Sequence, residues 1–541
     1  MGGLRDPATD ALVLAIDVGS TSARAGVFDS HGAMLASAST PFAVHRPLPD
    51  HAEHDSEQIW NAVGTSVRAA LAACPRSADT IAGVAFDATC SLVLLDADGA
   101  PVSVSAREDD HWNVVMWADH RAVQEAREIS ATGHRALDYV GGTMSPEMQL
   151  PKLLWLKRHR PAQWARYTHA MDLADFLTWK ATGTVSVSAC TVTCKWAYLN
   201  HEAVGWQQDL FDRIGLEDLQ RKFALPATAL PVGSRVGGLC AQTARNWGLR
   251  PGIAVATSMI DAHAGALGVL GATPSADLDD CLALIAGTSN CHMALSQDPR
   301  KVPGIWGPYF GALLPDGWLN EGGQSASGAL LDHVLDTHAC GAALGADRHF
   351  AIQQRIADQR RTQGAAYASD MLVVPDFHGN RSPLARPDVR GIVWGLDLDP
   401  SIDGLARLYH AAAVGIAYGT RHIIDALNQH GYRIRRLHLT GGHARSPLLV
   451  QLYANATGCE IVLPREADGV LLGTALLAAT AAGIHGSLLS AGQAMVHDRA
   501  VVAPEPEATG VHQRGYAAFR LLQGQRQQVL DLLHAATSDP P

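Results

Sequence analysis

Short apolar runs alternate along the chain with stretches of helical periodicity. Residues 12–16, 81–86 and 92–95 are runs typical of buried strands. Residues 23–28 follow the first run after a turn of small polar residues, so the two are expected to pair as a hairpin. Residues 56–73 are predicted to form an amphipathic helix with an apolar face of Ile59, Val63, Val67 and Leu71. This alternation favours an α/β architecture.

The turn after the first apolar run has a weak counterpart in the second half of the chain. Residues 15–22 pass from an apolar run into Gly-Ser, and residues 283–290 pass from a similar run into Gly-Thr. The two turns are separated by about half of the 541 residues, as expected for a duplicated domain. Turns of this kind are also common by chance, and that alternative stays open. A duplication would place the boundary near 271–280 and give domains of residues 1–272 and 273–541.

A strand, a tight turn and a helix are predicted in succession near residue 440. Residues 436–440 are predicted to form a strand, and the turn Gly441-Gly442 carries no side chains, so a flat ligand could approach its backbone closely. Ser446 and Pro447 are typical of a helix N-terminus, and Gly458 is typical of a helix end.

Composition and charge exclude several classes of protein. Hydrophobic residues make up 47% and charged residues 18%, which is ordinary for a globular chain and argues against disorder. Asp and Glu (53) outnumber Lys and Arg (42), and this acidic balance disfavours nucleic-acid binding. The longest apolar stretch, 470–484, is interrupted and too short for a bilayer span, so we expect a buried helix and no membrane association. The nine cysteines include no Cys-x-x-Cys, and three residues separate Cys190 from Cys194, which favours a reducing, cytoplasmic location.

The sequence lacks the motifs of P-loop enzymes, Rossmann dehydrogenases, zincins, α/β-hydrolases and protein kinases. Two turns are the candidates for a binding site instead. Asp17 ends a strand before a small-residue turn, a pattern suited to Mg²⁺ and a phosphate held by backbone N–H groups. A plain hairpin is the alternative. Gly287 and Thr288 form a similar turn that could contact the same polyphosphate, or be a coincidence.

Three other segments have both a functional and a structural interpretation. Asp261 lies among small and apolar residues, so it is either a general base for a sugar hydroxyl or the cap of the helix that follows. Residues 117–121 and 144–152 mix rings, carboxylates and bases, as sugar sites do, but could be charged surface helices. Four histidines show no metal-ligand spacing and are interpreted as structural: His263, His292, His378 and His443.

Taken in order, these motifs resemble the FGGY carbohydrate kinases over residues 12–483. The matching segments are residues 14–29, the Trp-x-Asp-x-Arg-Ala element at 116–122, residues 376–396 and the adenosine-type motif at 439–446. The resemblance implies a duplicated actin/hexokinase-like (ribonuclease H-like) ATPase fold, α/β in class, with two lobes around a central cleft. The N-terminal lobe, 1–272, would carry the sugar site, and the C-terminal lobe, 273–541, the nucleotide site.

The resemblance also implies a role for individual residues. Asp261 would be the catalytic base, and Asp17 and Asp261 would lie at a Mg²⁺ ion, Asp17 through water. ATP would be bound by Gly19, Ser20, Thr21, Arg24, Gly287, Thr288, Gly328, Gly441 and Gly442. The sugar would be bound by Asp87, Asp119, Arg121, Glu147, Lys152 and Asp261.

The sequence differs from the xylulokinase-like branch of the family at one segment, which argues against xylulose as the substrate. Residues 88–91 read Ala-Thr-Cys-Ser where xylulokinase-like members carry Gln-Met-His-Gly, whereas 119–121, 145–148 and 304–308 resemble the ribulokinase branch. We therefore expect an ATP- and Mg²⁺-dependent kinase that forms D-ribulose 5-phosphate from D-ribulose, as a possible homodimer. L-ribulose, a pentitol such as ribitol, and a non-catalytic sugar or nucleotide sensor on the same fold are the alternatives.

Overall fold

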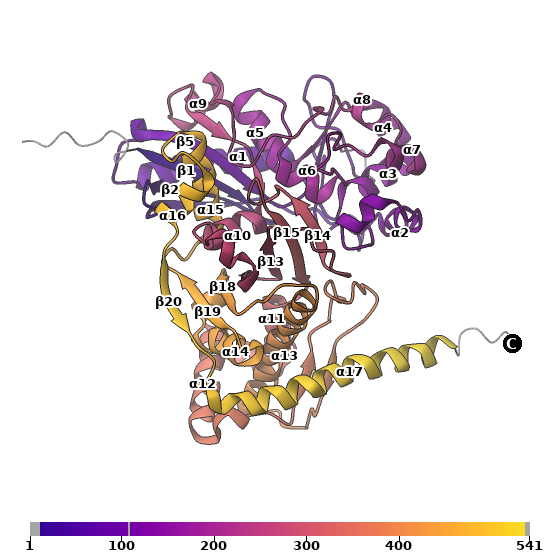
Figure 1. Cartoon of the computed structure of the whole chain (residues 1–541), viewed down its shortest axis with the longest axis vertical. Coiled ribbons are helices and arrows are strands. Elements are labelled where there is room, and N and C mark those ends of the chain that lie inside the picture. The colour runs from indigo at the N-terminus through magenta and orange to yellow at the C-terminus, as the bar shows by residue number, and fades with distance from the viewer. Residues whose placement is uncertain (1–10, 107–108, 536–541) are drawn as a thin grey trace, which may run out of the picture. The chain divides into compact units, whose positions relative to one another are not determined.

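The computed structural model in Figure 1 describes residues 11–106 and 109–535. The chain divides into two compact units, each assembled from three segments. Unit 1 contains Met1–Leu278, Met293–Glu321 and Pro464–His497; unit 2 contains Asp279–His292, Gly322–Leu463 and Asp498–Pro541. The units interleave along the chain, and the lobe boundary expected between residues 272 and 273 stays a prediction.

Unit 1 is built on a mixed sheet with the strand order β3-β2-β1-β5-β10-β9 and with β11 also paired to β5. β1 pairs antiparallel with β2 and parallel with β5, so the predicted hairpin is confirmed. β5 also pairs parallel with β10 and with β11. The strands are β1 (Leu12–Val18), β2 (Ser22–Asp29), β3 (Met34–Pro41), β5 (Ile81–Ala88), β9 (Arg235–Gly238), β10 (Ala254–Ala256) and β11 (Met259–Ile260).

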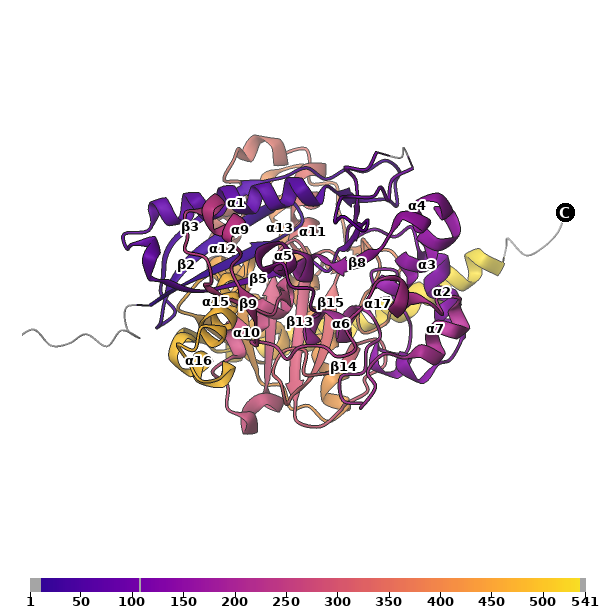
Figure 2. The same ribbon diagram turned by 90° about the horizontal axis from the view of Figure 1, so that it is seen from above.

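Helix α1 (Ser56–Ala73) covers one face of this sheet, as Figure 2 shows. Its bounds are those predicted from the apolar spacing, and Ile59, Val63 and Val67 are fully buried. The side chain of Asp55 accepts hydrogen bonds from two N–H groups of the first turn, which fixes where the helix begins.

Helices α10 (Asp261–Leu270) and α15 (Gly469–Ala481) pack against each other, and α15 also packs on β1 and β5. The apolar stretch predicted as a core helix is therefore confirmed in α15, which is buried almost all round. The two helices approach so closely that a Cβ atom on Gly473 would lie 1.8 Å from the carbonyl oxygen of Ala264. A Cβ atom on Gly268 would lie 1.9 Å from the carbonyl oxygen of Gly469.

The remainder of unit 1 surrounds a second, four-stranded sheet with the order β4-β7-β6-β8. Its strands are β4 (Glu53–His54), β6 (Leu92–Leu95), β7 (Val114–Val115) and β8 (His169–Asp172). The other helices of unit 1 are α2 (Val123–Ala131), α3 (Gln149–His159), α4 (Pro161–Arg166), α5 (Leu173–Thr182), α6 (Ala189–Lys195), α7 (Gln208–Ile214), α8 (Leu219–Lys222), α9 (Ala241–Trp247), which contacts α1, and α16 (Leu488–Met495), which packs on α15.

The second large sheet has the order β14-β15-β13-β12-β18-β19-β20, and its strands β13 and β15 contribute residues to both units. β12 pairs parallel with β18, and β18 with β19. The strands are β12 (Cys281–Ala286), β13 (Asn290–Ser296), β14 (Trp306–Phe310), β15 (Trp318–Gln324), β18 (Arg436–Thr440), β19 (Glu460–Pro464) and β20 (Asp498–Val502).

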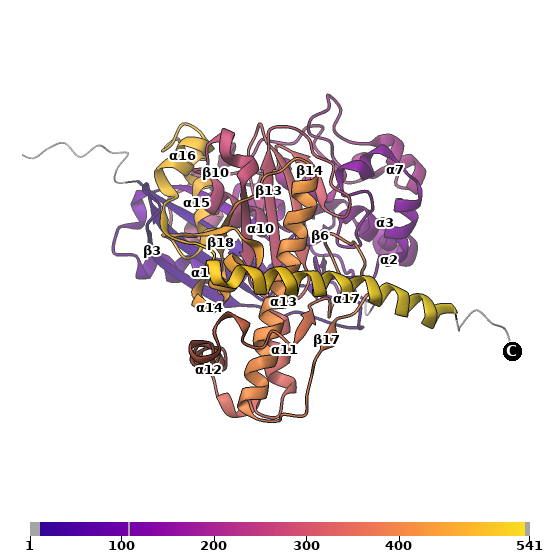
Figure 3. The same ribbon diagram turned by 60° about the horizontal axis from the view of Figure 1, so that its bottom comes forward.

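Long helices pack together in unit 2, where α13 contacts α11, α12, α14 and α17 (Figure 3). These helices are α11 (Gly328–Thr337), α12 (Arg348–Gln363), α13 (Ile402–Gln429), α14 (Pro447–Thr457) and α17 (Thr509–Ala535). A small hairpin of β16 (Leu372–Val374) and β17 (Ile392–Trp394) completes the unit. In the described part of the chain, no helix combines the length and apolar character needed to cross a bilayer.

The two large sheets repeat one strand order. The series β3-β2-β1-β5-β10 in the first sheet corresponds to β15-β13-β12-β18-β19 in the second, with the glycine turns at the same place in each series. The expected α/β class and the half-length repeat are therefore confirmed. The predicted unit after β18 is confirmed as well, because Ser446 caps α14, Pro447 opens it and Gly458 ends it in a left-handed conformation.

We predict that Gly473→Ala destabilises the protein, because the added methyl group has no room unless α10 and α15 move apart. Overpacking of a closely packed core costs about 1–3 kcal/mol, so the midpoint of thermal unfolding should fall by several degrees. Gly486→Ala is the matched control, since a Cβ atom there meets nothing within 4 Å. Equal midpoints for the two variants in differential scanning fluorimetry would show that the close helix contact is not needed.

Candidate active site

Three aspartates lie at the carboxyl ends of adjacent strands in unit 1. Asp17 of β1 and Asp87 of β5 are direct neighbours in the parallel register. β11 pairs with the end of β5 through Met259 and Ile260, and Asp261 follows as the first residue of α10. Ligands of open α/β sheets bind at this end of the strands. The structure therefore brings the predicted base and the predicted metal residue to one edge of the sheet.

Burial raises the pKa of two of these carboxylates, Asp87 and Asp261. Asp87 is fully buried, and desolvation together with the charge of Asp17 raises its pKa well above the usual range. Asp261 is partly exposed, and burial, with a smaller contribution from Asp17, raises its pKa to about 6. The N–H group of Ala262 donates to Asp261 over 2.7 Å, which offsets part of that rise. A neighbouring like charge disfavours the ionised form of a carboxylate, and burial acts in the same direction.

Arg24 of β2 balances part of this negative charge. Its Nε atom donates to Asp17 Oδ2 over 2.6 Å, and its Nη1 atom donates to Asp468. Asp468 also caps α15, and Thr474 of the same helix donates to Asp87 Oδ2. Sequence reasoning missed Asp468 and Thr474, because no local motif connects them to the aspartates more than 380 residues earlier in the chain.

The turn after β1 is a tight hairpin turn held by its surroundings. The N–H group of Gly19 donates to Ser22 O over 3.0 Å. Trp117 donates from Nε1 to Ser20 Oγ over 2.9 Å, and His54 Nε2 lies 2.9 Å from Ser20 O. Thr21 is exposed. The backbone of this turn is therefore that of a plain hairpin. Phosphate binding by the turn, beside the neighbouring carboxylates, stays a prediction.

Asp119 and Arg121 lie in a turn before α2, and both side chains are fully enclosed. Arg121 donates to both carboxylate oxygens of Asp119, and to Glu53 over 2.8 Å. It also packs over the ring of Trp155. The alternative of a charged surface helix is wrong for this segment. These side chains bind each other, which gives them a scaffolding role, and their contact with a sugar stays a prediction.

The two remaining candidate sugar residues lie around α3. Lys152 is fully buried, its Nζ atom donates to Met116 O over 3.0 Å, and burial lowers its pKa. Glu147 is partly exposed just before the helix. Nearby acidic groups, including Asp119 and Glu147, oppose the fall in the pKa of Lys152. A charged residue fully enclosed in this way needs such partners.

In unit 2, the turn after β12 is held against the N-terminus of α11. Ser327 Oγ and the N–H group of Gly328 each donate to Gly287 O over 3.0 Å. A Cβ atom on Gly328 would lie 2.6 Å from that oxygen, so only glycine allows this approach. Thr288 is exposed at the tip of the turn. Gly328 therefore supports the second glycine turn, and its expected place beside adenine and ribose stays a prediction.

A cavity of about 910 Å³ opens in unit 2 between α12 and α14. Gly442 lines this cavity. Gly441 has φ +92°, and a Cβ atom on it would lie 2.4 Å from the carbonyl oxygen of Ala286, so this position requires glycine. The volume lies within the usual range for ligand pockets. Polar groups from both helices line the cavity: His349, Gln353, Arg360, Arg445, Ser446 and Gln451.

A cluster of cysteine and histidine lies beside Asp261. His263 Nδ1 is 3.1 Å from Cys190 Sγ and 3.8 Å from Cys194 Sγ, and His263 Nε2 is 3.2 Å from Glu321 Oε2. Burial disfavours charge here, but the bond from Cys194 and the charge of His263 lower the pKa of Cys190. The sequence showed no metal-ligand spacing around His263, but the fold places two cysteine thiols beside it; its interpretation as a structural residue stays a prediction. The four-residue spacing of the cysteines, one helical turn, was the signal available.

Both halves of the chain match domains of one known protein family. Residues 12–268 match the N-terminal domain, and residues 282–482 the C-terminal domain, of the FGGY family of carbohydrate kinases. An FGGY carbohydrate kinase domain-containing protein of Homo sapiens is 41% identical over 98% of this chain and 99% of its own length. A D-ribulokinase of Saccharomyces cerevisiae is 35% identical over 86% of this chain and 71% of its own length.

Solved structures share the fold at lower identity. A xylulose kinase from Rhodospirillum rubrum superposes with a TM-score of 0.77 at 22% identity, covering 96% of this chain and 99% of its own. Plasmodium falciparum glycerol kinase gives a TM-score of 0.76 at 16% identity, covering 94% of this chain and 97% of its own. With both family domains matched along most of its length, the chain belongs to the FGGY family of carbohydrate kinases.

Proposed function

We propose that this carbohydrate kinase transfers the γ-phosphate of ATP to a hydroxyl group of a ketopentose, with D-ribulose the favoured acceptor and D-ribulose 5-phosphate the product. The observation that carries the proposal is Asp261, a partly exposed carboxylate beside two buried ones, with its pKa raised to about 6. The similarity to the yeast D-ribulokinase supports D-ribulose over other acceptors. L-ribulose and pentitols such as ribitol are the same-class alternatives.

Asp261 is proposed as the general base. A carboxylate with a pKa near 6 is ionised at neutral pH, yet is more basic than an ordinary aspartate. It would accept the proton of the sugar hydroxyl as that oxygen forms its bond to the γ-phosphorus and the bond to ADP breaks. Phosphoryl transfer depends mainly on positioning and charge neutralisation, so a single modest base is sufficient.

The carboxylates of unit 1 fit a divalent cation. Asp17, Asp87 and Asp261 supply the carboxylate oxygens that Mg²⁺ prefers, and a bound cation would offset the repulsion that raises the pKa of Asp87 and of Asp261. Asp17 would hold the ion through water and exchange its contact with Arg24 for that role. When bound, Mg²⁺ neutralises phosphate charge as it develops in the transition state.

The remaining assignments follow the family pattern. The backbone of Gly19, Ser20 and Thr21, together with Arg24, would bind phosphate, as would Gly287 and Thr288. Gly441 and Gly442 would border adenine and ribose at the cavity beside α14, with Gly328 nearby. Sugar binding would use Asp87, Asp119, Arg121, Glu147, Lys152 and Asp261. The lobes would comprise residues 1–272 and 273–541.

Substrate choice is testable with a panel of acceptors in a coupled assay of ADP release. We expect kcat/KM for D-ribulose to exceed that for L-ribulose, D-xylulose and ribitol at least tenfold, since contacts to one misplaced hydroxyl are worth more than about 1.4 kcal/mol in a polar site. A higher value for L-ribulose or ribitol would replace D-ribulose as the acceptor. ATP binding without turnover of any acceptor would instead favour a sensor.

The base is tested by Asp261→Asn. Turnover should fall by about 10²–10⁴, the usual contribution of a general base, with ATP affinity changed only by a small factor. Asp316→Asn, at an exposed position, is the matched control and should leave turnover unchanged. Isothermal titration with ATP and steady-state kinetics separate the two effects.

The pH dependence gives a second readout for the same variant. In the parent enzyme kcat should fall below about pH 6 as Asp261 takes up a proton. The raised pKa means that folded Asp261 binds a proton more tightly than unfolded Asp261 does. The free energy of unfolding therefore decreases as pH rises from about 4 to about 6. Asp261→Asn should therefore unfold at a higher temperature than the parent at pH 8 and at an equal one at pH 4. Unchanged turnover would remove Asp261 from the proposed role.

A further inference from the structure

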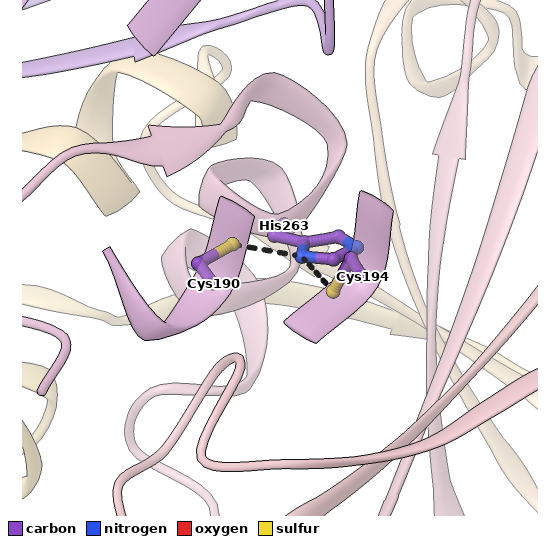
Figure 4. A group of neighbouring side chains, drawn as sticks. All are labelled: Cys190, Cys194 and His263. Carbon is purple, nitrogen blue, oxygen red and sulfur yellow. Dashed lines mark hydrogen bonds between the residues drawn. The ribbon is translucent and has the colours of Figure 1, made fainter. Parts of the chain in front are cut away.

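We propose that Cys190, Cys194 and His263 bind a zinc ion in unit 1. Figure 4 shows the three side chains pointing toward one another, with the two cysteines on α6 and the histidine on α10. All three are fully buried, and their ligand atoms lie within 4.8 Å of one another. The proposal does not depend on the identity of the sugar.

The spacing of the ligand atoms suits a tetrahedral site. Zn–S and Zn–N bonds of about 2.3 and 2.0–2.1 Å place a sulfur and a nitrogen about 3.6 Å apart at tetrahedral angles. The measured separations of His263 Nδ1 from Cys190 Sγ and Cys194 Sγ are 3.1 and 3.8 Å, on either side of that value. A change of about half an ångström or less in each of these two separations would reach the tetrahedral value.

The groups behind the ligands are those that a zinc site needs. Glu321 Oε2 lies 3.2 Å from His263 Nε2, so the carboxylate fixes the proton on Nε2 and leaves Nδ1 to bind metal. The N–H group of Ile260 points at Cys190 Sγ over 3.5 Å, as amides do at metal-bound thiolates. Lys195 Nζ, 3.7 Å from Glu321 Oε2, balances the carboxylate charge.

Charge favours zinc over a monovalent soft ion. Two thiolates, one neutral imidazole and Zn²⁺ sum to zero, whereas Cu⁺ would leave a net negative charge buried in the protein, which is unfavourable. Thiolate and imidazole ligands also exclude the hard cation Mg²⁺. Three protein ligands leave a fourth position for water. Bound zinc would join α6 to the first turn of α10, two residues after Asp261.

Metal content of the full-length protein tests the proposal. We expect one zinc per chain after purification under reducing conditions, equilibration with buffered zinc and desalting, measured by inductively coupled plasma mass spectrometry. Cys190→Ser and Cys194→Ser should each reduce this to below about a tenth. Cys459→Ser, which removes another buried thiol from unit 2, is the matched control and should keep the zinc.

Cobalt substitution supplies a readout independent of variant folding. The parent protein with Co²⁺ should show thiolate-to-cobalt charge-transfer absorption and tetrahedral d–d bands, both displaced by zinc. A parent protein without bound zinc and without these bands would overturn the proposal and leave a metal-free thiolate–imidazolium pair. Zinc kept in full by both folded cysteine variants, or copper bound in preference to zinc, would overturn it as well.

Discussion

Repulsion between carboxylates governs the architecture of unit 1. Parallel pairing of β1 and β5 places Asp17 beside Asp87, and the short pairing of β11 brings Asp261 to the same edge. Such a set is unfavourable in a buried setting unless protons or cations accompany it. Arg24 and Thr474 meet part of this demand. The remaining negative charge suits the divalent cation and the general base proposed for this site.

The close contact of α10 with α15 brings residues from near position 470 to the aspartates of β1 and β5. Gly268 and Gly473 remove the side chains that would keep the helices apart. α15 can then lie on β1 and β5 with Thr474 at Asp87, while its cap, Asp468, reaches Arg24. Backbone packing and site electrostatics therefore depend on the same helix.

Local patterns predicted much of the fold and less of the site. The hairpin, α1, α14 with its cap and the half-length repeat all leave short-range signals, namely apolar spacing, a capping serine and glycine turns. Asp468, Thr474 and Glu321 leave none, because only tertiary packing brings them to Arg24, Asp87 and His263. Burial likewise leaves no local signal in the sequence, so the pairing of Asp119 with Arg121 could not be predicted from it.

The return of residues 464–497 to unit 1 constrains how the chain matures on the ribosome. Synthesis delivers β1, β5 and α10 long before α15, with most of unit 2 made in between. Until α15 emerges, the apolar face of β1 and β5 that it covers stays exposed, and Asp87 lacks Thr474. Nascent chains in this interval expose an apolar surface of the kind that chaperones bind. A protein truncated before residue 464 would therefore lack a finished N-terminal core as well as its C-terminal part.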